Sequence, residues 1–146
     1  MKFLVINGPN LNLLGRREPD IYGKRDYAAL CAHVKAAAAA QNIEVDIMQT
    51  NHEGVIVDAI QDAIDKYDGI IINPAAYTHT SVAIADAIAA VGIPTAEVHL
   101  SDVDAREDFR RISFVTPVCT LRVKGLGFDS YSKAITDLAT HIRANG

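Results

Sequence analysis

The sequence predicts an α/β fold built on a five-stranded parallel sheet, and three observations lead to this prediction. Short apolar runs that suit buried strands recur five times along the chain. Segments with helical spacing of apolar residues separate these runs, which gives a repeated β-α order. The length of 146 residues suits one domain with its own core, without a solenoid repeat. We therefore expect a single domain over residues 1–146.

The expected strands differ in how deeply they are buried. Lys2–Ile6 and 68–72 are near-continuous apolar runs, typical of strands that are covered on both faces. The segment 43–48 alternates apolar and polar residues, which favours an edge position. Pro74 ends the third strand. The expected strands cover residues 2–6, 43–48, 68–72, 94–98 and 118–123.

Helices are expected between the strands, several with recognisable ends. Asp26 can cap the first, and Thr80 or Ser81 can cap a later one that Gly92 closes. Right-handed crossovers would place helices on both faces of a sheet in the order 2-1-3-4-5, the flavodoxin-like arrangement. The expected helices cover 26–41, 55–66 with Ile56, Ala59, Ile60, Ala63 and Ile64 inward, 80–91, a short charged helix at 104–111, and 130–144.

Composition excludes several classes of protein. A net charge of −4 disfavours a general nucleic-acid binder, which would normally be basic. No apolar run reaches the roughly 18 residues of a membrane-spanning helix, and no signal-peptide pattern opens the chain. We therefore expect a cytoplasmic protein without nucleic-acid or membrane partners. Cys31 and Cys119 lack a CxxC spacing and are expected to be buried free thiols.

Polar residues follow the first, third and fourth expected strands. In this kind of sheet, ligands bind outside the carboxyl ends of the strands, where the strand order reverses. The first connection, residues 7–23, is far longer than the usual 2–6 residues, and its apolar residues favour a lid over a disordered linker. Three loops thus predict one cleft, with the polar candidates Asn7, Asn10, Arg17, Tyr22, Asn73, His79, Glu97, His99 and Ser101.

Two of these candidates suit acid–base chemistry. A free tyrosine has a pKa near 10, but one or two close guanidinium groups, such as Arg16 and Arg17, can lower the pKa of Tyr22 to about 7–8. Glu97 and His99 share one face of a strand, so the carboxylate can fix the imidazole tautomer for a general acid. The structural alternatives are a tyrosine packed under its loop and a histidine bonded at a strand end.

The sequence lacks the usual signatures of metals and phosphate cofactors. It has no HxH or HExxH spacing, and Gly8-Pro9 fits neither GxGxxG nor a Walker loop. A phospho-receiver would need acids where Asn7 and Asn73 stand. We therefore expect neither metal nor cofactor. The arginines of the first loop and of 106–111 suit a small, anionic, polyhydroxylated ligand.

Over essentially its whole length, the chain resembles the type II 3-dehydroquinate dehydratases. The resemblance rests on NGPNLNLLGRREPDIYG at 7–23, NHEG at 51–54, NPAAYTHTS at 73–81, and EVHLS at 97–101 followed by ARE and FRR at 105–111. It implies a cofactor-free lyase that reversibly dehydrates 3-dehydroquinate to 3-dehydroshikimate through an enolate. It also implies a dodecamer, a tetramer of trimers, in which Asp86 reaches a neighbour's site.

The resemblance also implies roles for individual residues. Tyr22 would remove a C2 proton, Arg17 would lower the pKa of Tyr22, and Asn10 would hold a water near the enolate. His99, oriented by Glu97, would protonate the leaving C1 hydroxyl. Substrate hydroxyls would be bound by Asn73, His79 and Arg110, and the substrate carboxylate by Leu100 and Ser101. Asp102 departs from the family, since many members carry Asn there.

Two alternatives to catalysis stay open at this point. The same scaffold could be a non-catalytic sensor of an anionic polyol, which would need the cleft but not Tyr22 or the Glu97–His99 pair. A flavin carrier is a further alternative. The sequence also leaves open whether the reaction serves shikimate and aromatic amino acid biosynthesis or quinate catabolism.

Overall fold

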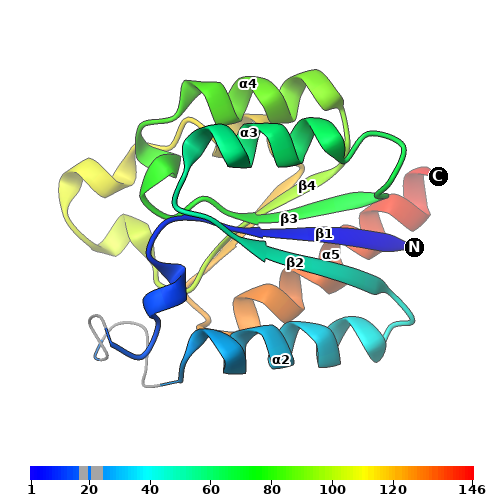
Figure 1. Ribbon diagram of the computed structural model, residues 1–146, viewed down its shortest axis with the longest axis horizontal. Helices are drawn as coiled ribbons and strands as arrows, with labels where there is room; N and C mark the ends of the chain where they lie inside the picture. Colours follow the sequence, from blue (N-terminus) through cyan, green and yellow to red (C-terminus); the bar gives the residue numbers. More distant parts are fainter. Residues whose placement is uncertain (17–19, 21–24) are drawn as a thin grey trace.

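The sheet has the predicted strands in the predicted order. The computed structural model describes residues 1–16, 20 and 25–146. Its strands form one parallel sheet in the order β2-β1-β3-β4-β5, which confirms the flavodoxin-like arrangement and the edge position of β2 (Figure 1). The strands are β1 (Lys2–Asn7), β2 (Glu44–Gln49), β3 (Gly69–Asn73), β4 (Thr95–His99) and β5 (Leu121–Lys124).

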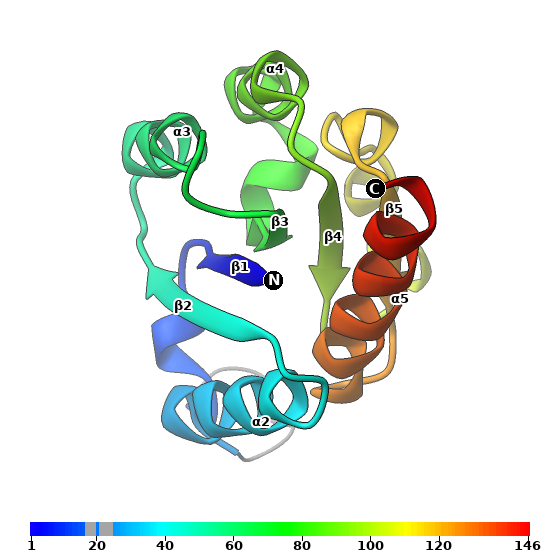
Figure 2. The same ribbon diagram turned by 90° about the vertical axis from the view of Figure 1, so that its right-hand side faces the viewer.

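Helices cover both faces of the sheet (Figure 2). Phe3 and Val5 belong to the cluster beneath α2 and α5, whereas Leu4 and Ile6 belong to the cluster beneath α3 and α4. Successive strand residues point to opposite faces, so β1 is buried from both sides. The helices are α2 (Tyr27–Ala39), α3 (Glu53–Asp62), α4 (Val82–Val91) and α5 (Asp129–Asn145). No helix of the described part of the chain is long and apolar enough to cross a membrane.

The expected caps are present. The Asp26 carboxylate accepts a hydrogen bond from the Ala29 N–H at 2.9 Å, and the Ser81 hydroxyl accepts one from the Ile84 N–H at 2.9 Å. Gly92 ends α4 with φ +68°, a conformation that glycine adopts without strain. Local sequence chemistry therefore sets these three helix ends.

Several predicted boundaries were wrong. α3 ends at Asp62 instead of Lys66, because the chain turns at Asp65 with φ +64°; Ile64, expected inward, is 49% exposed. The charged segment at 104–111 forms two short 3₁₀ helices, η3 (Val103–Ala105) and η4 (Asp108–Arg111), instead of one helix.

The last strand begins three residues later than predicted. Thr116–Val118 form a 3₁₀ helix, η5, which contains Pro117, a residue without an N–H for a strand ladder. Cys119 therefore precedes β5 instead of lying within it. Cys31 and Cys119 are free, as expected, but half-buried instead of fully buried.

Candidate active site

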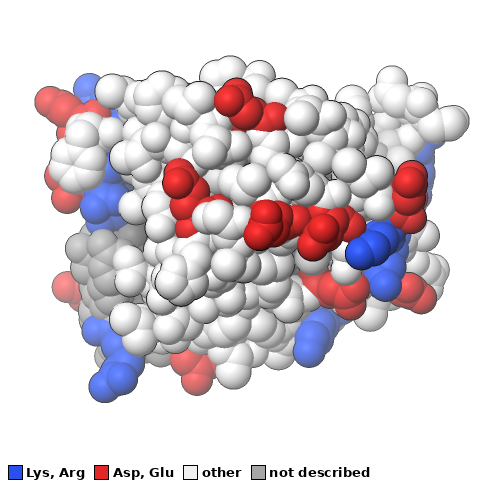
Figure 3. All heavy atoms as spheres, turned by 45° about the horizontal axis from the view of Figure 1, so that its top comes forward, with Lys and Arg blue, Asp and Glu red and all other residues white. Residues whose placement is uncertain are grey.

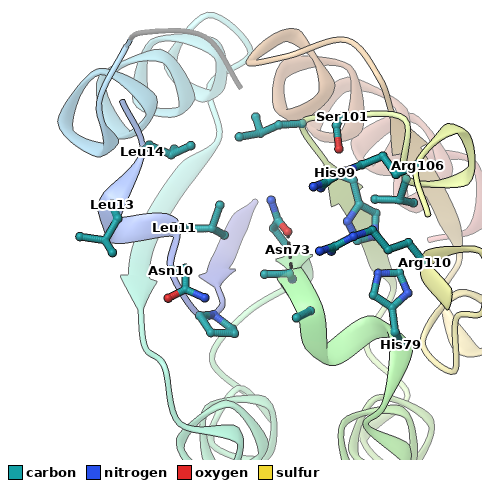
Figure 4. Close-up of a pocket in the computed structure, with 15 residues that line it drawn as sticks. Asn10, Leu11, Leu13, Leu14, Asn73, His79, His99, Ser101, Arg106 and Arg110 are labelled. Atoms are coloured by element: carbon teal, nitrogen blue, oxygen red, sulfur yellow. Dashed lines mark hydrogen bonds between the residues drawn. The ribbon is translucent and has the colours of Figure 1, made fainter. Parts of the chain in front are cut away.

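A pocket lies at the carboxyl ends of β1, β3 and β4, where the strand-order rule predicts a ligand. It holds about 700 Å³ of space between the atoms, part of which is open to solvent. Figure 4 shows residues after β1 on one side, His99 with Arg106 and Arg110 on the other, and Asn73 between them. The lining comprises Pro9, Asn10, Leu11, Leu13, Leu14, Asn73, Ala75, Ala76, His79, His99, Leu100, Ser101, Val103, Arg106 and Arg110.

Two loops meet closely at the floor of the pocket. The Gly8 N–H donates to the Asn73 carbonyl at 2.8 Å, and a Cβ on Gly8 would lie 2.7 Å from the Pro74 carbonyl oxygen. Only glycine permits this approach. Asn10 follows with φ +70°, a left-handed conformation that asparagine tolerates well, and its N–H donates to the Asn51 side chain at 3.1 Å. The 3₁₀ helix η1 (Leu11–Leu13) then forms one wall.

Asn73 is held from below by a buried network. Its Nδ2 donates to the Tyr131 hydroxyl at 2.9 Å, and that hydroxyl donates to Asn7 Oδ1 at 2.7 Å. Burial raises the pKa of Tyr131, so its hydroxyl stays protonated and can keep both roles. Asn7, expected in the cleft, is fully buried and belongs to this supporting network instead.

Glu97 and His99 form a buried pair at the pocket wall. His99 Nε2 lies 2.6 Å from Glu97 Oε2, and Glu97 is completely buried. Burial raises the pKa of the Glu97 carboxyl, but the hydrogen bond and charge of His99, with two threonine hydroxyls, outweigh burial and bring that pKa below its usual value. An ionised Glu97 can only accept, so Nε2 carries the proton and Nδ1 is the ring nitrogen left for a ligand.

His79 lies in the 3₁₀ helix η2 (Ala75–His79), and its orientation is also fixed by a hydrogen bond. Its Nδ1 lies 2.6 Å from the Ile112 carbonyl oxygen, which can only accept. Nδ1 therefore carries a proton, and Nε2 is available to a ligand in the pocket.

Two arginines give the pocket a basic wall. Arg110 Nε lies 2.6 Å from Glu107 Oε2, and its guanidinium lies 5.0 Å from the centre of the Phe109 ring. Arg106 lines the pocket beside it, with Nε 4.0 Å from the same carboxylate oxygen. This wall suits an anionic ligand, as the arginine pattern of the sequence indicates.

The loop after β4 is fastened to the end of β5. Leu100 accepts a hydrogen bond from the Gly127 N–H at 3.0 Å, and Lys124 Nζ lies 2.7 Å from Asp102 Oδ1. The hydrogen bond from Lys124 holds the pKa of the Asp102 carboxyl below its usual value. Asp102 thus faces β5 and not the pocket lining, which consists here of Leu100 and Ser101.

Comparisons with known proteins decide the family. The family described as Dehydroquinase class II matches residues 1–139. The 3-dehydroquinate dehydratase of Nostoc sp. is 49% identical over 143 residues, 98% of this chain and 97% of that protein. The crystal structure of the type II dehydroquinase from Butyrivibrio crossotus is 51% identical with a TM-score of 0.93, covering 95% of this chain and 97% of that one. The chain belongs to the class II dehydroquinase family.

Membership of the dehydroquinase family identifies this chain as an enzyme, a hydro-lyase of the 3-dehydroquinate dehydratase class. The structure gathers most of the polar residues predicted for such a site around one pocket. Arg17 and Tyr22 lie outside the described residues. Asp86 is exposed on α4, away from the pocket lining; Figure 3, a view over α3 and α4, shows acidic side chains across this face. Within the described ranges, no His, Cys, Asp or Glu cluster has a metal-binding arrangement.

Sequence reasoning missed the residues that support the site. The hydroxyls of Thr78 and Thr116 contact Glu97, and Tyr131 holds Asn73. Tyr131 lies in the helix expected over 130–144, and nothing in that expectation assigned it a role in the site. Arg106, one of the arginines expected to suit an anionic ligand, lines the pocket. A hydroxyl in a loop carries no periodic signal, so only the fold identifies these partners.

Proposed function

We propose that this chain catalyses the reversible dehydration of 3-dehydroquinate to 3-dehydroshikimate through an enolate intermediate in the described pocket. The observation that carries the proposal is the buried Glu97–His99 pair, with a 2.6 Å contact, at the wall of a basic pocket in a class II dehydroquinase. Such a pair suits a general acid whose tautomer and direction are fixed.

The chemistry of the substrate sets what the site must supply. The C2 protons lie next to the C3 ketone, so a base can remove one and leave an enolate. The enolate then expels the C1 hydroxyl, which takes up a proton and leaves as water, and a C1–C2 double bond conjugated with the ketone forms. The reaction therefore needs a base near C2, a donor near the enolate oxygen and an acid near the C1 hydroxyl.

His99 is the proposed acid. Glu97 occupies Nε2, so Nδ1 would deliver the proton to the C1 hydroxyl, and the imidazole that remains keeps its Nε2 proton. The buried Glu97 carboxylate would stabilise the charged imidazole before the transfer and hold its plane during it.

Tyr22 is the proposed base, with Arg17 lowering its pKa. Among the described residues of the pocket lining, only His79 and His99 have side chains that ordinarily exchange a proton near neutral pH. His99 is the proposed acid and His79 a proposed ligand of the substrate hydroxyls, so we propose that Tyr22 of the first loop supplies the base. Asn10 is proposed to hold a water that donates to the enolate oxygen.

The rest of the lining would orient the substrate. The backbone N–H groups of Leu100 and Ser101, with the Ser101 hydroxyl, suit the substrate carboxylate. Asn73 and Arg110 would bind the ring hydroxyls with donors at the pocket wall, and His79 would bind them through its Nε2. These roles belong to ground-state binding, so their loss should raise KM more than it lowers kcat.

Tyr22→Phe tests the proposal in a direct assay. Wild-type protein with 3-dehydroquinate should give a rise in ultraviolet absorbance from the conjugated enone. Tyr22→Phe should lower kcat by about 10²–10⁴-fold and leave substrate binding nearly unchanged, because only the base is lost. Tyr67→Phe is the matched control, because the Tyr67 hydroxyl bonds Asp46 far from the pocket.

Two outcomes would contradict the proposal. Turnover by Tyr22→Phe at the wild-type rate would exclude Tyr22 as the base. Tight binding of 3-dehydroquinate by the wild-type protein without turnover would instead favour a sensor on the same scaffold.

Assembly, location and pathway stay predictions. We propose a dodecamer built as a tetramer of trimers, with Asp86 reaching a neighbour's site, and a cytoplasmic location. The exposure of Asp86 on α4 is compatible with contact to another subunit. The reaction would serve shikimate and aromatic amino acid biosynthesis or quinate catabolism.

A further inference from the structure

The Glu97 carboxylate is surrounded by hydroxyl groups that the proposed reaction does not use. Oε2 accepts from the Thr78 hydroxyl at 2.5 Å as well as from His99, and Oε1 accepts from the Thr116 hydroxyl at 2.5 Å. Ser113 Oγ lies 2.9 Å from Thr78 Oγ1 and 2.8 Å from Thr116 Oγ1. We call Thr78, Ser113 and Thr116 the hydroxyl cage.

The protons of the hydroxyl cage can be assigned by counting. Each hydroxyl has one proton, and an ionised carboxylate only accepts. Thr78 and Thr116 must therefore both donate to Glu97, so neither can donate to Ser113. Ser113 instead donates its own proton to one of the two threonines, and its oxygen accepts the Thr116 N–H at 3.0 Å. Both threonine hydroxyl protons therefore point toward the Glu97 carboxylate.

The hydroxyl cage joins three parts of the chain around the proposed acid. Thr78 belongs to η2, Glu97 to β4, and Ser113 and Thr116 to the segment before β5. The Phe114 N–H donates to the Thr78 carbonyl at 2.9 Å, which aligns this segment with η2. None of the three cage residues lines the pocket, so none of them contacts a substrate there directly, and the group in the site that they bond is Glu97.

We propose that the hydroxyl cage of Thr78, Ser113 and Thr116 fixes the Glu97 carboxylate and thereby positions His99 for proton transfer. The proposal rests on the proposed function of His99 as the acid. A carboxylate held at both oxygens cannot rotate, so the Nε2–H direction, and with it the Nδ1 direction, is set before substrate binds. Thr78, Ser113 and Thr116 are positioning residues, since they touch neither substrate nor reacting atoms.

Other titratable groups near Glu97 do not replace the hydroxyl cage. His99 is the titratable neighbour on β4, and its Nε2 contacts Glu97 directly. Cys119 faces Glu97 from the segment before β5, but burial, together with the charge of Glu97, raises the pKa of its thiol to about 12. The thiol therefore stays neutral. The two threonine hydroxyls are the donors that complete the coordination of the carboxylate among the described residues.

Thr116→Val and Thr116→Ser form the test pair. Valine keeps the shape of threonine without the hydroxyl, whereas serine keeps the hydroxyl. Thr116→Val should lower kcat by about 10-fold, as expected for a lost hydrogen bond to a charged group, with KM within about two-fold. Thr116→Ser should recover most of that loss. The Nε2–H proton resonance of His99 should shift in Thr116→Val and lie close to its wild-type position in Thr116→Ser.

Thr95→Val is the matched control for a buried hydroxyl in the same strand as Glu97. Thr95 is 1% exposed, and its hydroxyl bonds the Ile93 carbonyl at 2.8 Å instead of Glu97. Thr95→Val should destabilise the fold without changing kcat or the His99 resonance. If Thr116→Val cannot be folded, Thr78→Val with Thr78→Ser provides the same comparison at the other oxygen.

Three results would overturn the proposal that the hydroxyl cage positions His99. Thr116→Val could keep the wild-type kcat and His99 resonance, Thr116→Ser could lose as much as Thr116→Val, or Thr95→Val could lose kcat equally. A wild-type protein without dehydratase turnover would instead defeat the proposed function. In that case the His99 resonance still decides whether the cage orients the pair.

Discussion

Glu97 is a single buried carboxylate that keeps its charge through hydrogen bonds. Its partners are one imidazole and two hydroxyls, at 2.5–2.6 Å. An ion removed from water loses solvation that only well-placed hydrogen bonds can replace. The arrangement therefore holds a charge where the proposed reaction needs it, and it should make the free energy of unfolding depend on pH.

This dependence should appear on the acid side of neutral pH. The pKa of Glu97 is lower in the folded protein than in the unfolded chain, so the unfolded chain binds protons more readily as pH falls. The stabilisation by Glu97 is full above the unfolded pKa, near 4.3, and is lost as pH falls through the folded value. Glu97→Gln should cost about 3 kcal/mol at neutral pH, and the difference from wild type should shrink below about pH 4.

Urea unfolding at a series of pH values measures this difference. Other carboxyls with a lowered pKa, including Asp46, Asp102 and Glu107, contribute equally to both proteins and cancel in the comparison. A difference between the two proteins that stays constant from neutral to acid pH would show that Glu97 is not a stabilising ion in the fold.

The end of β5 and the loop after β4 act together at the scale of elements. Lys124 contacts both Asp102 and Asp104, and Arg122 Nη2 lies 3.1 Å from Asp104 Oδ2. Gly125 follows with φ +82°, where an added Cβ would lie 3.4 Å from Asp102. The two cations fasten the loop and offset two carboxylates close to the proposed binding site for the substrate carboxylate.

Lys124→Met should weaken substrate binding more than catalysis. Without Lys124, the charges of Asp102 and Asp104 are less balanced and disfavour an anion at Leu100 and Ser101. We expect KM to rise about 3–10-fold at low salt and less at high salt, because salt screens exposed charges. Steady-state kinetics at two salt concentrations measures this rise in KM. Adding Asp102→Asn to Lys124→Met should bring KM part of the way back to the wild-type value. An unchanged KM at low salt would separate this loop from carboxylate binding.

Elements with a local signal were predicted, and those set by distant contacts were not. The apolar runs of β1 and β3 and the caps at Asp26 and Ser81 lie within a few residues of what they determine, so the sequence shows them. The late start of β5 follows from Pro117 and from Thr116, whose hydroxyl is engaged by Glu97, 19 residues away. Such a contact has no local pattern.

In the candidate site, too, features with a local sequence pattern were predicted and features set by distant contacts were not. The rule that ligands bind where strand order reverses placed the loops after β1, β3 and β4 at one pocket. The pairing of Glu97 with His99 followed from strand periodicity. The buried role of Asn7 could not be predicted, because its partner Tyr131 lies 124 residues away. Long-range polar contacts under a site thus need the fold before they can be identified.

At the scale of the whole molecule, Tyr131 joins the last helix to the centre of the sheet. Its hydroxyl bonds Asn7 at the end of β1 and Asn73 at the end of β3, directly below the pocket. Tyr131 is fully buried among the core residues of α5. The C-terminal helix therefore supports the floor of the site as well as covering one face of the sheet.

Tyr131→Phe should weaken the fold and the site together. Phenylalanine fills the same space but leaves Asn7 Oδ1 and Asn73 Nδ2 without their buried partner, which costs about 1–3 kcal/mol. We expect Tm to fall by roughly 3–8 °C and KM to rise about 2–5-fold through the loosened Asn73. Tyr67→Phe is the control, since its hydroxyl bonds Asp46 and Tyr67 is not part of the pocket lining, and it should leave KM unchanged. Thermal unfolding with and without a substrate analogue, alongside kinetics, measures both effects. A lower Tm with an unchanged KM would show that the Tyr131 hydroxyl stabilises the core but does not position Asn73 for substrate binding. Unchanged values of both Tm and KM would show that this hydroxyl supports neither the fold nor the site.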